Sequence, residues 1–204
     1  MLKVTLVDYG LGNIQAFANI YRRLNIDVAV AQNADELAAA EKIVLPGVGA
    51  FDWAMSRLEA SGMRGCLDEL VLGLGRPVLG ICVGMQMMAA RSDEGELAGL
   101  RWFDAEVKRF PERVSDQKVQ LPHMGWNDVT TVDGTLFRGI GAPRFYFLHS
   151  YYFAPRNPSD VLASADYHRN FTASVRHGNI YGVQFHPEKS HHWGVQLLKN
   201  FAEL

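Results

Sequence analysis

The first half of the chain alternates short apolar runs with segments in which apolar residues recur at helical spacing. The runs have the length of strands and are bounded by glycine, proline or polar residues. They predict strands over residues 4–7, 27–30, 42–45 and 77–82, with helices over residues 14–24, 51–60 and 63–74 and a further helix capped by Asn33 and Glu36. This order predicts a mostly parallel sheet with helices on both faces, in which sites gather at the carboxyl ends of the strands.

The second half is rich in aromatic and β-branched residues, which favour strands. The predicted strands cover residues 101–110, 119–121, 127–132, 145–153 and 161–165. Residues 172–176 and 180–185 flank the turn His177-Gly178-Asn179 and predict a hairpin, and residues 194–202 predict a closing amphipathic helix. Because no shift in composition marks a linker, residues 1–204 are expected to form one domain. Its expected class is α/β: three layers, with a mostly parallel central sheet, flanking helices and an added antiparallel β region.

A cysteine ends the last predicted strand of the first half. The segment Gly80-Ile81-Cys82-Val83-Gly84-Met85-Gln86 leads into residues 87–90, which have the pattern of a helix start. A sharp strand-to-helix turn leaves no room for a Cβ on either side of the projecting side chain, which accounts for both glycines. Near a helix N-terminus, unpaired N–H groups and the helix dipole favour the nucleophilic thiolate. The pattern predicts a nucleophile, with a cysteine that only packs in the core as the alternative.

His186 is the histidine best suited to activate such a thiol, since it ends the second strand of the predicted hairpin. Glu188 follows two residues later, and Pro187 favours an extended backbone, so both side chains are expected on one side of the strand. A carboxylate on one ring nitrogen fixes the tautomer and leaves the other nitrogen to face the thiol. Cys82, His186 and Glu188 are therefore predicted as nucleophile, base and orienting group. A solvated glutamate after a capped strand end is the alternative.

The same segment could instead hold a metal through His186, Glu188, His191 and His192, but the spacing matches no strong zinc pattern. His191 and His192 are expected at the surface. A structural, hydrogen-bonded role is expected for His123, His149, His168 and His177. No metal and no cofactor are expected.

Attack of a thiolate on an amide produces an oxyanion that needs backbone N–H donors. Val83 offers one such donor directly after the cysteine. The turn Pro46-Gly47-Val48-Gly49 ends a neighbouring strand, and its glycines permit close approach or a flip of a peptide group. Gly47 and Val48 are therefore predicted to complete an oxyanion hole with Val83, with an ordinary tight turn as the alternative.

Composition narrows the partners of such a site. With 204 residues, 48% of them hydrophobic, the chain can bury one substantial core. A formal charge of -2 without long runs of either sign lacks the basic footprint of nucleic-acid binding. No stretch approaches the ~20 apolar residues of a membrane span, and the start of the sequence lacks the pattern of a secretory signal. A cytoplasmic protein with no nucleic-acid or membrane partner is expected, in which the two cysteines are reduced.

Two motifs together resemble the class I, triad-type glutamine amidotransferases: residues 80–86 and Gln184-Phe185-His186-Pro187-Glu188-Lys189-Ser190. Within that superfamily, four further motifs resemble the glutaminase subunits of imidazole glycerol phosphate synthases. They are Asp8-Tyr9-Gly10-Leu11-Gly12-Asn13, Pro46-Gly47-Val48-Gly49-Ala50-Phe51, Pro122-His123-Met124-Gly125-Trp126-Asn127 and Phe145-Tyr146-Phe147-Leu148-His149-Ser150-Tyr151. The similarity runs from Asp8 to Phe201. Val83 departs from the family pattern, in which leucine is more usual, but a backbone donor is unaffected.

The resemblance implies a flavodoxin-like fold and a two-protein enzyme. This subunit would hydrolyse glutamine and pass ammonia to a TIM-barrel cyclase/synthase subunit in a heterodimer, which makes imidazole glycerol phosphate and aminoimidazole carboxamide ribonucleotide in histidine biosynthesis. Cys82 would attack the amide, His186 would move the protons, and Glu188 would hold the ring. The glutaminase would be nearly silent until the partner binds its ligand, with residues 46–49 as the switch.

The resemblance also implies two further sets of residues. The positions that match glutamine-binding residues are Gln86, Glu94, Ser150 and Tyr151. The positions that match the face toward the synthase subunit are Asn13, Trp126, Tyr146 and Lys189. Two other functions remain as alternatives: the same glutaminase in a paralogous complex that aminates another acceptor, such as a surface-polysaccharide sugar, or a catalytically silent interaction module.

Overall fold

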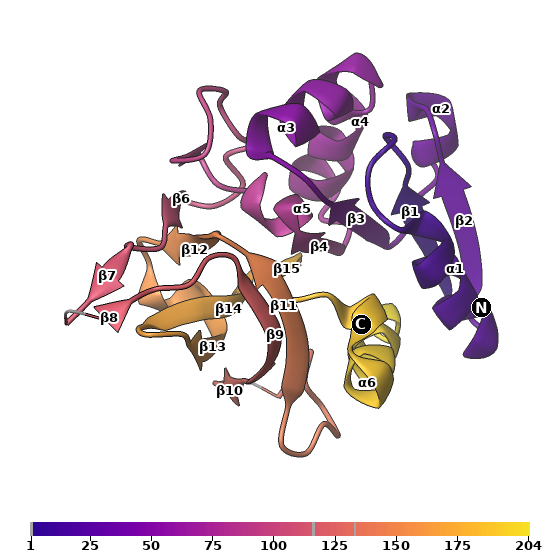
Figure 1. Cartoon of the computed structure of the whole chain (residues 1–204). Coiled ribbons are helices and arrows are strands. Elements are labelled where there is room, and N and C mark those ends of the chain that lie inside the picture. Colours follow the sequence, from indigo (N-terminus) through magenta and orange to yellow (C-terminus); the bar gives the residue numbers. More distant parts are fainter. Residues whose placement is uncertain (1, 116, 133) are drawn as a thin grey trace.

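The computed structural model of the chain describes residues 2–115, 117–132 and 134–204. Residues 1, 116 and 133, which belong to the predicted single domain, lie outside these residues. The central sheet has a parallel half, called here the half-sheet (Figure 1). In spatial order, the strands of the half-sheet are β2 (Asp27–Ala31), β1 (Lys3–Val7), β3 (Ile43–Gly47), β4 (Val78–Cys82) and β15 (Ile180–Val183). All neighbours in this order pair in parallel. The strands predicted in the first half of the sequence are confirmed.

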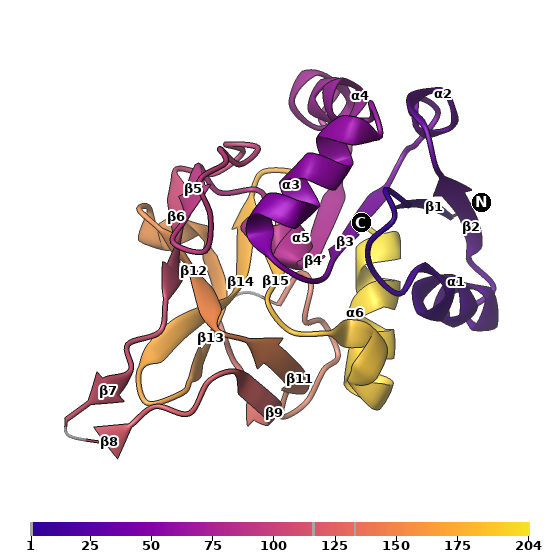
Figure 2. The same ribbon diagram turned by 45° about the horizontal axis from the view of Figure 1, so that its top comes forward.

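Helices cover both faces of the half-sheet, as Figures 1 and 2 show. On one face α1 (Ile14–Arg23) packs against α6 (His191–Ala202), and on the other lie α3 (Phe51–Ala60) and α4 (Arg64–Asp68), with α2 (Ala34–Leu37) beside α4. Asn33 caps α2 by accepting a hydrogen bond from the backbone N–H of Glu36, as predicted. The helix predicted over residues 63–74 changes after α4 into a π-helical turn, η1 (Glu69–Gly73).

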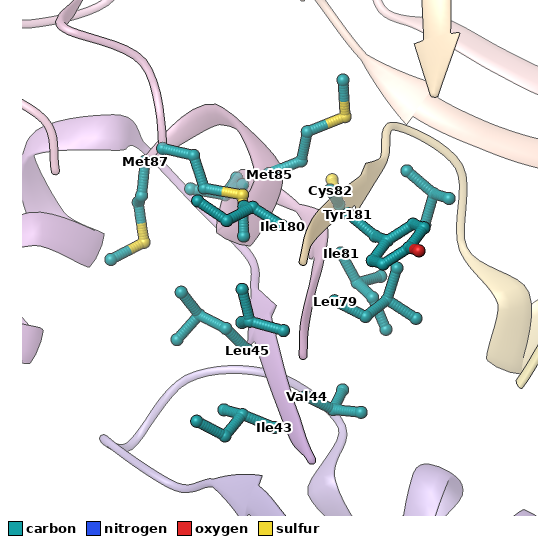
Figure 3. Packing of buried hydrophobic residues seen from close by; sticks show 14 of the residues in the cluster. Ile43, Val44, Leu45, Leu79, Ile81, Cys82, Met85, Met87, Ile180 and Tyr181 are labelled. Carbon is teal, nitrogen blue, oxygen red and sulfur yellow. The ribbon is translucent and has the colours of Figure 1, made fainter. Parts of the chain in front are cut away.

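The buried strands β3, β4 and β15 form the centre of the hydrophobic core (Figure 3). Every residue of these three strands is buried, because helices or other chain segments cover both faces of the sheet. Cys82 lies at the end of β4 that is farther from Ile43 in Figure 3. In the described residues, no helix combines the length and the apolar character that crossing a membrane requires.

Beyond β15 the sheet becomes largely antiparallel. The hairpin predicted around Gly178 is confirmed, and it joins β15 to β14 (Asn170–His177). The sheet continues from β14 through β12 (Tyr151–Pro155), β6 (Ala105–Arg109) and β5 (Arg91–Ser92), and it also carries β13 (Val161–Asp166) and β10 (Thr130–Thr131). Two separate pairs are formed by β9 (His123–Asp128) with β11 (Arg144–His149) and by β7 (Arg113–Val114) with β8 (Gln117–Lys118). The remaining short elements are α5 (Val83–Gln86) and the 3₁₀ turns η2 (Pro158–Asp160) and η3 (Pro187–Lys189).

Several predicted strands of the second half have different bounds. The strand predicted over residues 145–153 is two strands, β11 and β12, which belong to different sheets and are separated by Ser150. Residues 119–121 form no strand, and residues 101–104 precede β6 as an irregular segment in which Arg101 has a φ of 60°. The strand predicted over residues 127–132 is divided between β9 and β10.

The helix start predicted at residues 87–90 is wrong. The helix after Cys82 is α5, which begins at Val83 and already ends at Gln86. The carbonyl groups of residues 87–90 accept hydrogen bonds from the backbone N–H groups of residues 99–103, for example from Leu100 to Met87 at 2.7 Å. These distant donors replace the next turn of the helix.

Candidate active site

Cys82 occupies a strained turn between β4 and α5. Its φ is 56° and its ψ is -113°, a conformation that a residue with a Cβ rarely adopts, and the residue is only 4% exposed. A Cβ on Gly80 would lie 2.7 Å from the carbonyl oxygen of Gly84. A Cβ on Gly84 would in turn collide with the carbonyl oxygen of Leu45 on β3. The two glycines therefore allow the backbone contacts that the sequence pattern predicted around the cysteine.

His186 and Glu188 lie against each other beside this turn. The distance between His186 Nδ1 and Glu188 Oε1 is 2.9 Å, and both side chains are almost fully buried. Burial alone lowers the pKa of His186, but its interactions with Cys82 and Glu188, including their negative charges, raise it above its ordinary value. The three predicted residues are thus brought together, with the imidazole between the thiol and the carboxylate.

The route by which Glu188 reaches the imidazole differs from the predicted extended strand. β15 ends at Val183, and η3 begins at Pro187, a residue favoured at the first position of a helical turn. His186 itself is extended, and the following turn carries Glu188 back toward the ring. The prediction that the side chains of His186 and Glu188 lie together is confirmed, but the prediction that an extended backbone joins them is wrong.

Two other elements hold the backbone of His186. Its N–H donates to the carbonyl oxygen of Tyr146 on β11 at 2.9 Å. The hydroxyl of Ser190 donates to the carbonyl oxygen of His186 at 2.6 Å and accepts from the N–H of Tyr146 at 3.0 Å. Gly194 on α6 packs so closely on the carbonyl group of Pro187 that a Cβ at position 194 would collide with it. The position of the imidazole is therefore fixed by β11 and α6 as well as by its own strand.

An open pocket of about 180 Å³ lies in front of Cys82. Its walls include His186 and the predicted donor residues Val48 and Val83. The four predicted glutamine-binding residues also line it: Gln86, Glu94, Ser150 and Tyr151. Gly47 does not line the pocket, because it is buried against the backbone of residues 83 and 84.

Gln184 is a site residue that sequence reasoning did not single out. Its Nε2 lies 3.9 Å from Sγ of Cys82, and its Oε1 accepts from Nε2 of Gln86 at 3.0 Å. The same nitrogen of Gln86 donates to the carbonyl oxygen of Tyr151 at 3.1 Å. Gln184 precedes His186 by two residues, and this alternation was the signal that could have placed it on the same side.

Glu94 connects the pocket to the start of α3. Its Oε2 accepts a hydrogen bond from the backbone N–H of Phe51 at 2.9 Å, and Ala50 before it provides no side-chain cap. Burial raises the pKa of Glu94, the bond from Phe51 opposes that shift, and the charge of Asp52 adds to it. Glu94 therefore fixes the end of the turn that contains Val48.

The turn at residues 46–49 is exposed at Val48 and fixed by a hydrogen bond at Pro46. Val48 is 39% exposed, and Gly49 has a φ of 87°. The hydroxyl of Tyr9 donates to the carbonyl oxygen of Pro46 at 2.7 Å, which fixes the peptide before Gly47. Burial, and then the charge of Cys82, raise the pKa of Tyr9. Tyr9 lies in one of the family-like motifs, but no local pattern in the sequence indicated this contact.

Three of the four residues predicted to face a partner form one partly exposed cluster, in which Trp126 and Lys189 are exposed and Tyr146 is half-buried. Trp126 on β9 lies opposite Tyr146 on β11, with ring centroids 6.1 Å apart, and Nζ of Lys189 lies 5.9 Å from the centre of the Tyr146 ring. Trp126 also stacks on His191 at 5.2 Å. The fourth residue, Asn13, is at the start of α1, where its side chain accepts from the N–H of residue 16.

The other histidines have varied surroundings. His191 and His192 are exposed, as predicted. His177 contacts Asp160 at 3.1 Å. His168 is exposed beside Tyr167 and has no hydrogen-bond partner among the residues that the structure describes, unlike the structural role expected for it. Within the described ranges, no group of three or more His, Cys, Asp or Glu side chains is arranged to hold a metal ion.

Known proteins resemble the chain along nearly its whole length. A family model for class-I glutamine amidotransferases matches residues 5–204. Imidazole glycerol phosphate synthase subunit HisH of Bdellovibrio bacteriovorus is 58% identical over 203 residues, which cover 98% of this chain and 100% of that protein. The subunit of the same name from Leptospira interrogans is 48% identical with the same coverage.

Solved structures of low sequence identity share the fold. A glutamine amidotransferase structure superposes with a TM-score of 0.75 at 19% identity, covering 98% of this chain and 97% of that one. A glutamine amidotransferase from Thermotoga maritima gives a TM-score of 0.62 at 20% identity, covering 92% and 76%. At these identities the similarity concerns the fold alone.

Proposed function

The chain belongs to the class-I glutamine amidotransferases, and from this premise we propose that it is the glutaminase subunit of an imidazole glycerol phosphate synthase of histidine biosynthesis. The observation that carries the proposal is the site at the end of β4. There the strained Cys82 and His186 line the same pocket, and Nδ1 of His186 lies 2.9 Å from Oε1 of Glu188. The names of the relatives support the assignment to this synthase.

In the proposed reaction the thiolate of Cys82 attacks the side-chain amide carbon of glutamine. The tetrahedral oxyanion accepts hydrogen bonds from the backbone N–H groups of Val83 and Val48. The imidazolium of His186 gives its proton to the departing ammonia, and a thioester remains on the cysteine. His186 then takes a proton from water, which attacks the thioester and releases glutamate. The raised pKa of His186 favours the charged form that the first proton transfer requires.

Glutamine is proposed to lie between the strand-to-helix turn at Cys82, called here the elbow, and residues 150–151. Glu94 offers a carboxylate for the α-ammonium group, and Ser150 and Tyr151 offer backbone groups. Gln86 contributes less directly, since its amide nitrogen already donates to Tyr151 and Gln184. Its role is proposed to be the support of the pocket wall.

The proposed partner is a synthase subunit with a TIM-barrel fold, which receives the ammonia in a heterodimer within the cytoplasm. The partly exposed cluster of Trp126, Tyr146 and Lys189 is proposed to face it, together with Asn13. The turn at Val48 is proposed as the switch. If the Val48 N–H turns away at rest, the oxyanion lacks a donor, and loss of one donor costs about 10²–10³ in rate. We therefore expect weak glutaminase activity from the isolated chain.

Substitution of the cysteine tests the proposal in the complex with the synthase subunit. Cys82→Ala should abolish glutamine-dependent formation of imidazole glycerol phosphate and leave ammonia-dependent formation intact. Cys66→Ala is the matched control, since this second thiol lies away from the pocket and contacts the carbonyl oxygen of Ala34. Loss of both activities in Cys82→Ala would show that the cysteine is structural. Consumption of the ammonia by a different acceptor would replace the proposed synthase with a paralogous complex.

A further inference from the structure

Two buried histidines form a continuous hydrogen-bonded chain that begins at the pocket, which His149 itself lines. Nδ1 of His149 lies 2.7 Å from the carbonyl oxygen of Tyr151, and its Nε2 lies 3.0 Å from Nδ1 of His123. Nε2 of His123 lies 3.4 Å from Nδ2 of Asn127, which also donates to the carbonyl oxygen of Asp166 at 2.7 Å. The chain therefore runs from the pocket wall to β9 and on to β13.

The acceptors at the two ends fix the direction of every bond. A carbonyl oxygen can only accept, so Nδ1 of His149 must donate to Tyr151. In a neutral His149 the other nitrogen then accepts from Nδ1 of His123, whose Nε2 in turn accepts from Asn127. A charge on either ring would place two hydrogens against each other at one of these contacts. The arrangement is satisfied only while both rings are neutral.

The surroundings keep both rings neutral. His123 is 3% exposed and His149 is 6% exposed. The ring of His123 stacks on those of Tyr167 and Phe147, with centroid distances of 4.0 and 5.0 Å. Burial lowers the pKa of His123 to about 4. Burial also lowers the pKa of His149 to about 3, with the bond to Tyr151 opposing and the charges of His123 and His186 adding to the shift.

The pair contacts the pocket wall where the chain passes from one sheet to another. Ser150 separates β11 from β12, its carbonyl oxygen accepts from the N–H of Phe110 at 3.1 Å, and Tyr151 pairs with Arg109 of β6. The carbonyl of Tyr151 accepts hydrogen bonds from the side chains of His149 and Gln86. His123 approaches from β9, the strand that carries Trp126 on its exposed side.

We propose that His149 and His123 are positioning residues for glutamine, which hold the Ser150–Tyr151 backbone in its binding shape and tie it to β9. This inference rests on the proposed glutaminase function. His149 acts through the Tyr151 carbonyl, and His123 acts through His149. Neither ring takes a proton during the reaction.

Two substitutions of His149 separate the two ends of its ring. The amide of His149→Asn reaches approximately the position of Nδ1 and can still donate to Tyr151, but it is too short to reach His123. The amide of His149→Gln reaches approximately the position of Nε2 and leaves Tyr151 without its donor. His168→Gln is the matched control, because it makes the same change at an exposed histidine.

The measurement is alkylation of Cys82 in the complex with the synthase subunit. The chloroketone analogue of glutamine must occupy the pocket before it reacts, whereas iodoacetamide needs only the thiol. For His149→Gln we expect the half-saturating concentration of the chloroketone to rise about tenfold, as for a lost hydrogen bond in a buried site. The rate with iodoacetamide should stay within about twofold of the wild-type rate, and His149→Asn should recover most of the chloroketone affinity.

Three results would overturn the inference: unchanged saturation in His149→Gln, equal defects in the Gln and Asn variants, or equal slowing with both reagents. If His149→Gln does not fold, His123→Leu is measured in the same way. It removes the support behind His149 and should raise the half-saturating concentration about threefold, and an unchanged value would contradict the inference. Failure of the glutaminase proposal itself has a different signature, in which wild-type Cys82 reacts with iodoacetamide but not saturably with the chloroketone.

Discussion

Gly80 offers the most direct test of the elbow geometry, because a single methyl group there meets the backbone of the helix that follows. Gly80 has no positive φ, so Gly80→Ala introduces no backbone strain of its own. The new Cβ would lie 2.7 Å from the carbonyl oxygen of Gly84 and 2.6 Å from Cε of Met88. The methionine can move aside, but the carbonyl cannot move without α5.

The size of the displacement sets the expected effect. An ordinary carbon–oxygen contact is about 3.3 Å, so α5 must move from β4 by about 0.6 Å. Overpacking of this kind costs about 1–3 kcal/mol of stability. A misplacement of about 1 Å costs about 10²-fold in rate, so the shift of Val83 relative to Cys82 should reduce glutaminase turnover by about tenfold. Gly84→Ala, which collides with the backbone of β3, should cost more in both respects.

Glutamate release by the complex under saturating glutamine measures the rate, and urea unfolding of the isolated chain measures the stability. Gly65→Ala is the matched control, because its Cβ meets no atom within 4 Å and it lies in α4. Alanine should stabilise that helix by up to about 1 kcal/mol and leave the rate unchanged. If Gly80→Ala turned over glutamine at the wild-type rate with wild-type stability, the reasoning from close backbone contact would be refuted.

Two further outcomes are expected. Lys189→Ala should lower the ratio of synthesis to glutamine hydrolysis in the complex more than it lowers thioester formation, whereas Tyr146→Phe keeps the ring under the ammonium group and should preserve that ratio; an unchanged ratio in Lys189→Ala would contradict the proposed interface. The free energy of unfolding should fall by several kcal/mol as the pH drops from about 6.5 toward 4, because His123 and His149 bind protons in the unfolded chain before they do so in the folded one. The double variant His123→Asn, His149→Asn should lose less stability over the same range in urea titrations, and equal slopes would show that other groups cause the effect.

The parallel half of the fold was predictable because each of its strands carries its own local signal. The same is partly true of the turn at Cys82: Gly80 is required by a contact with Gly84 four residues later, whereas Gly84 is required by a contact with Leu45 on β3. By contrast, α5 ends early because the N–H groups of residues 99–103 occupy the carbonyls that a longer helix would use. The division at Ser150 was also invisible, since residues on both sides of it favour strands and only their partners differ.

The same distinction applies to the site. His186 and Glu188 were found through their spacing in the sequence, although a turn rather than a strand joins them. Tyr9 contributes through a contact with a residue far away in the sequence, which no local pattern reports. For Gln184 the only local signal was its spacing of two residues from His186. The catalytic and binding roles, and the single domain over residues 1–204, stay predictions.

The hydrogen bond between Glu94 and the N–H of Phe51 has a thermodynamic consequence for regulation. If glutamine engages Glu94 as proposed, the group that holds the substrate also holds the end of the turn that contains Val48. Thermodynamic linkage then requires reciprocity. If an event at the partner reorients the turn and increases glutamine affinity by some factor, glutamine binding must favour that event by the same factor. Glutamine binding would thereby favour the activated state of the partner subunit, which consumes the ammonia. A single coupling free energy would describe both the effect of the partner on glutamine affinity and the effect of glutamine on the partner.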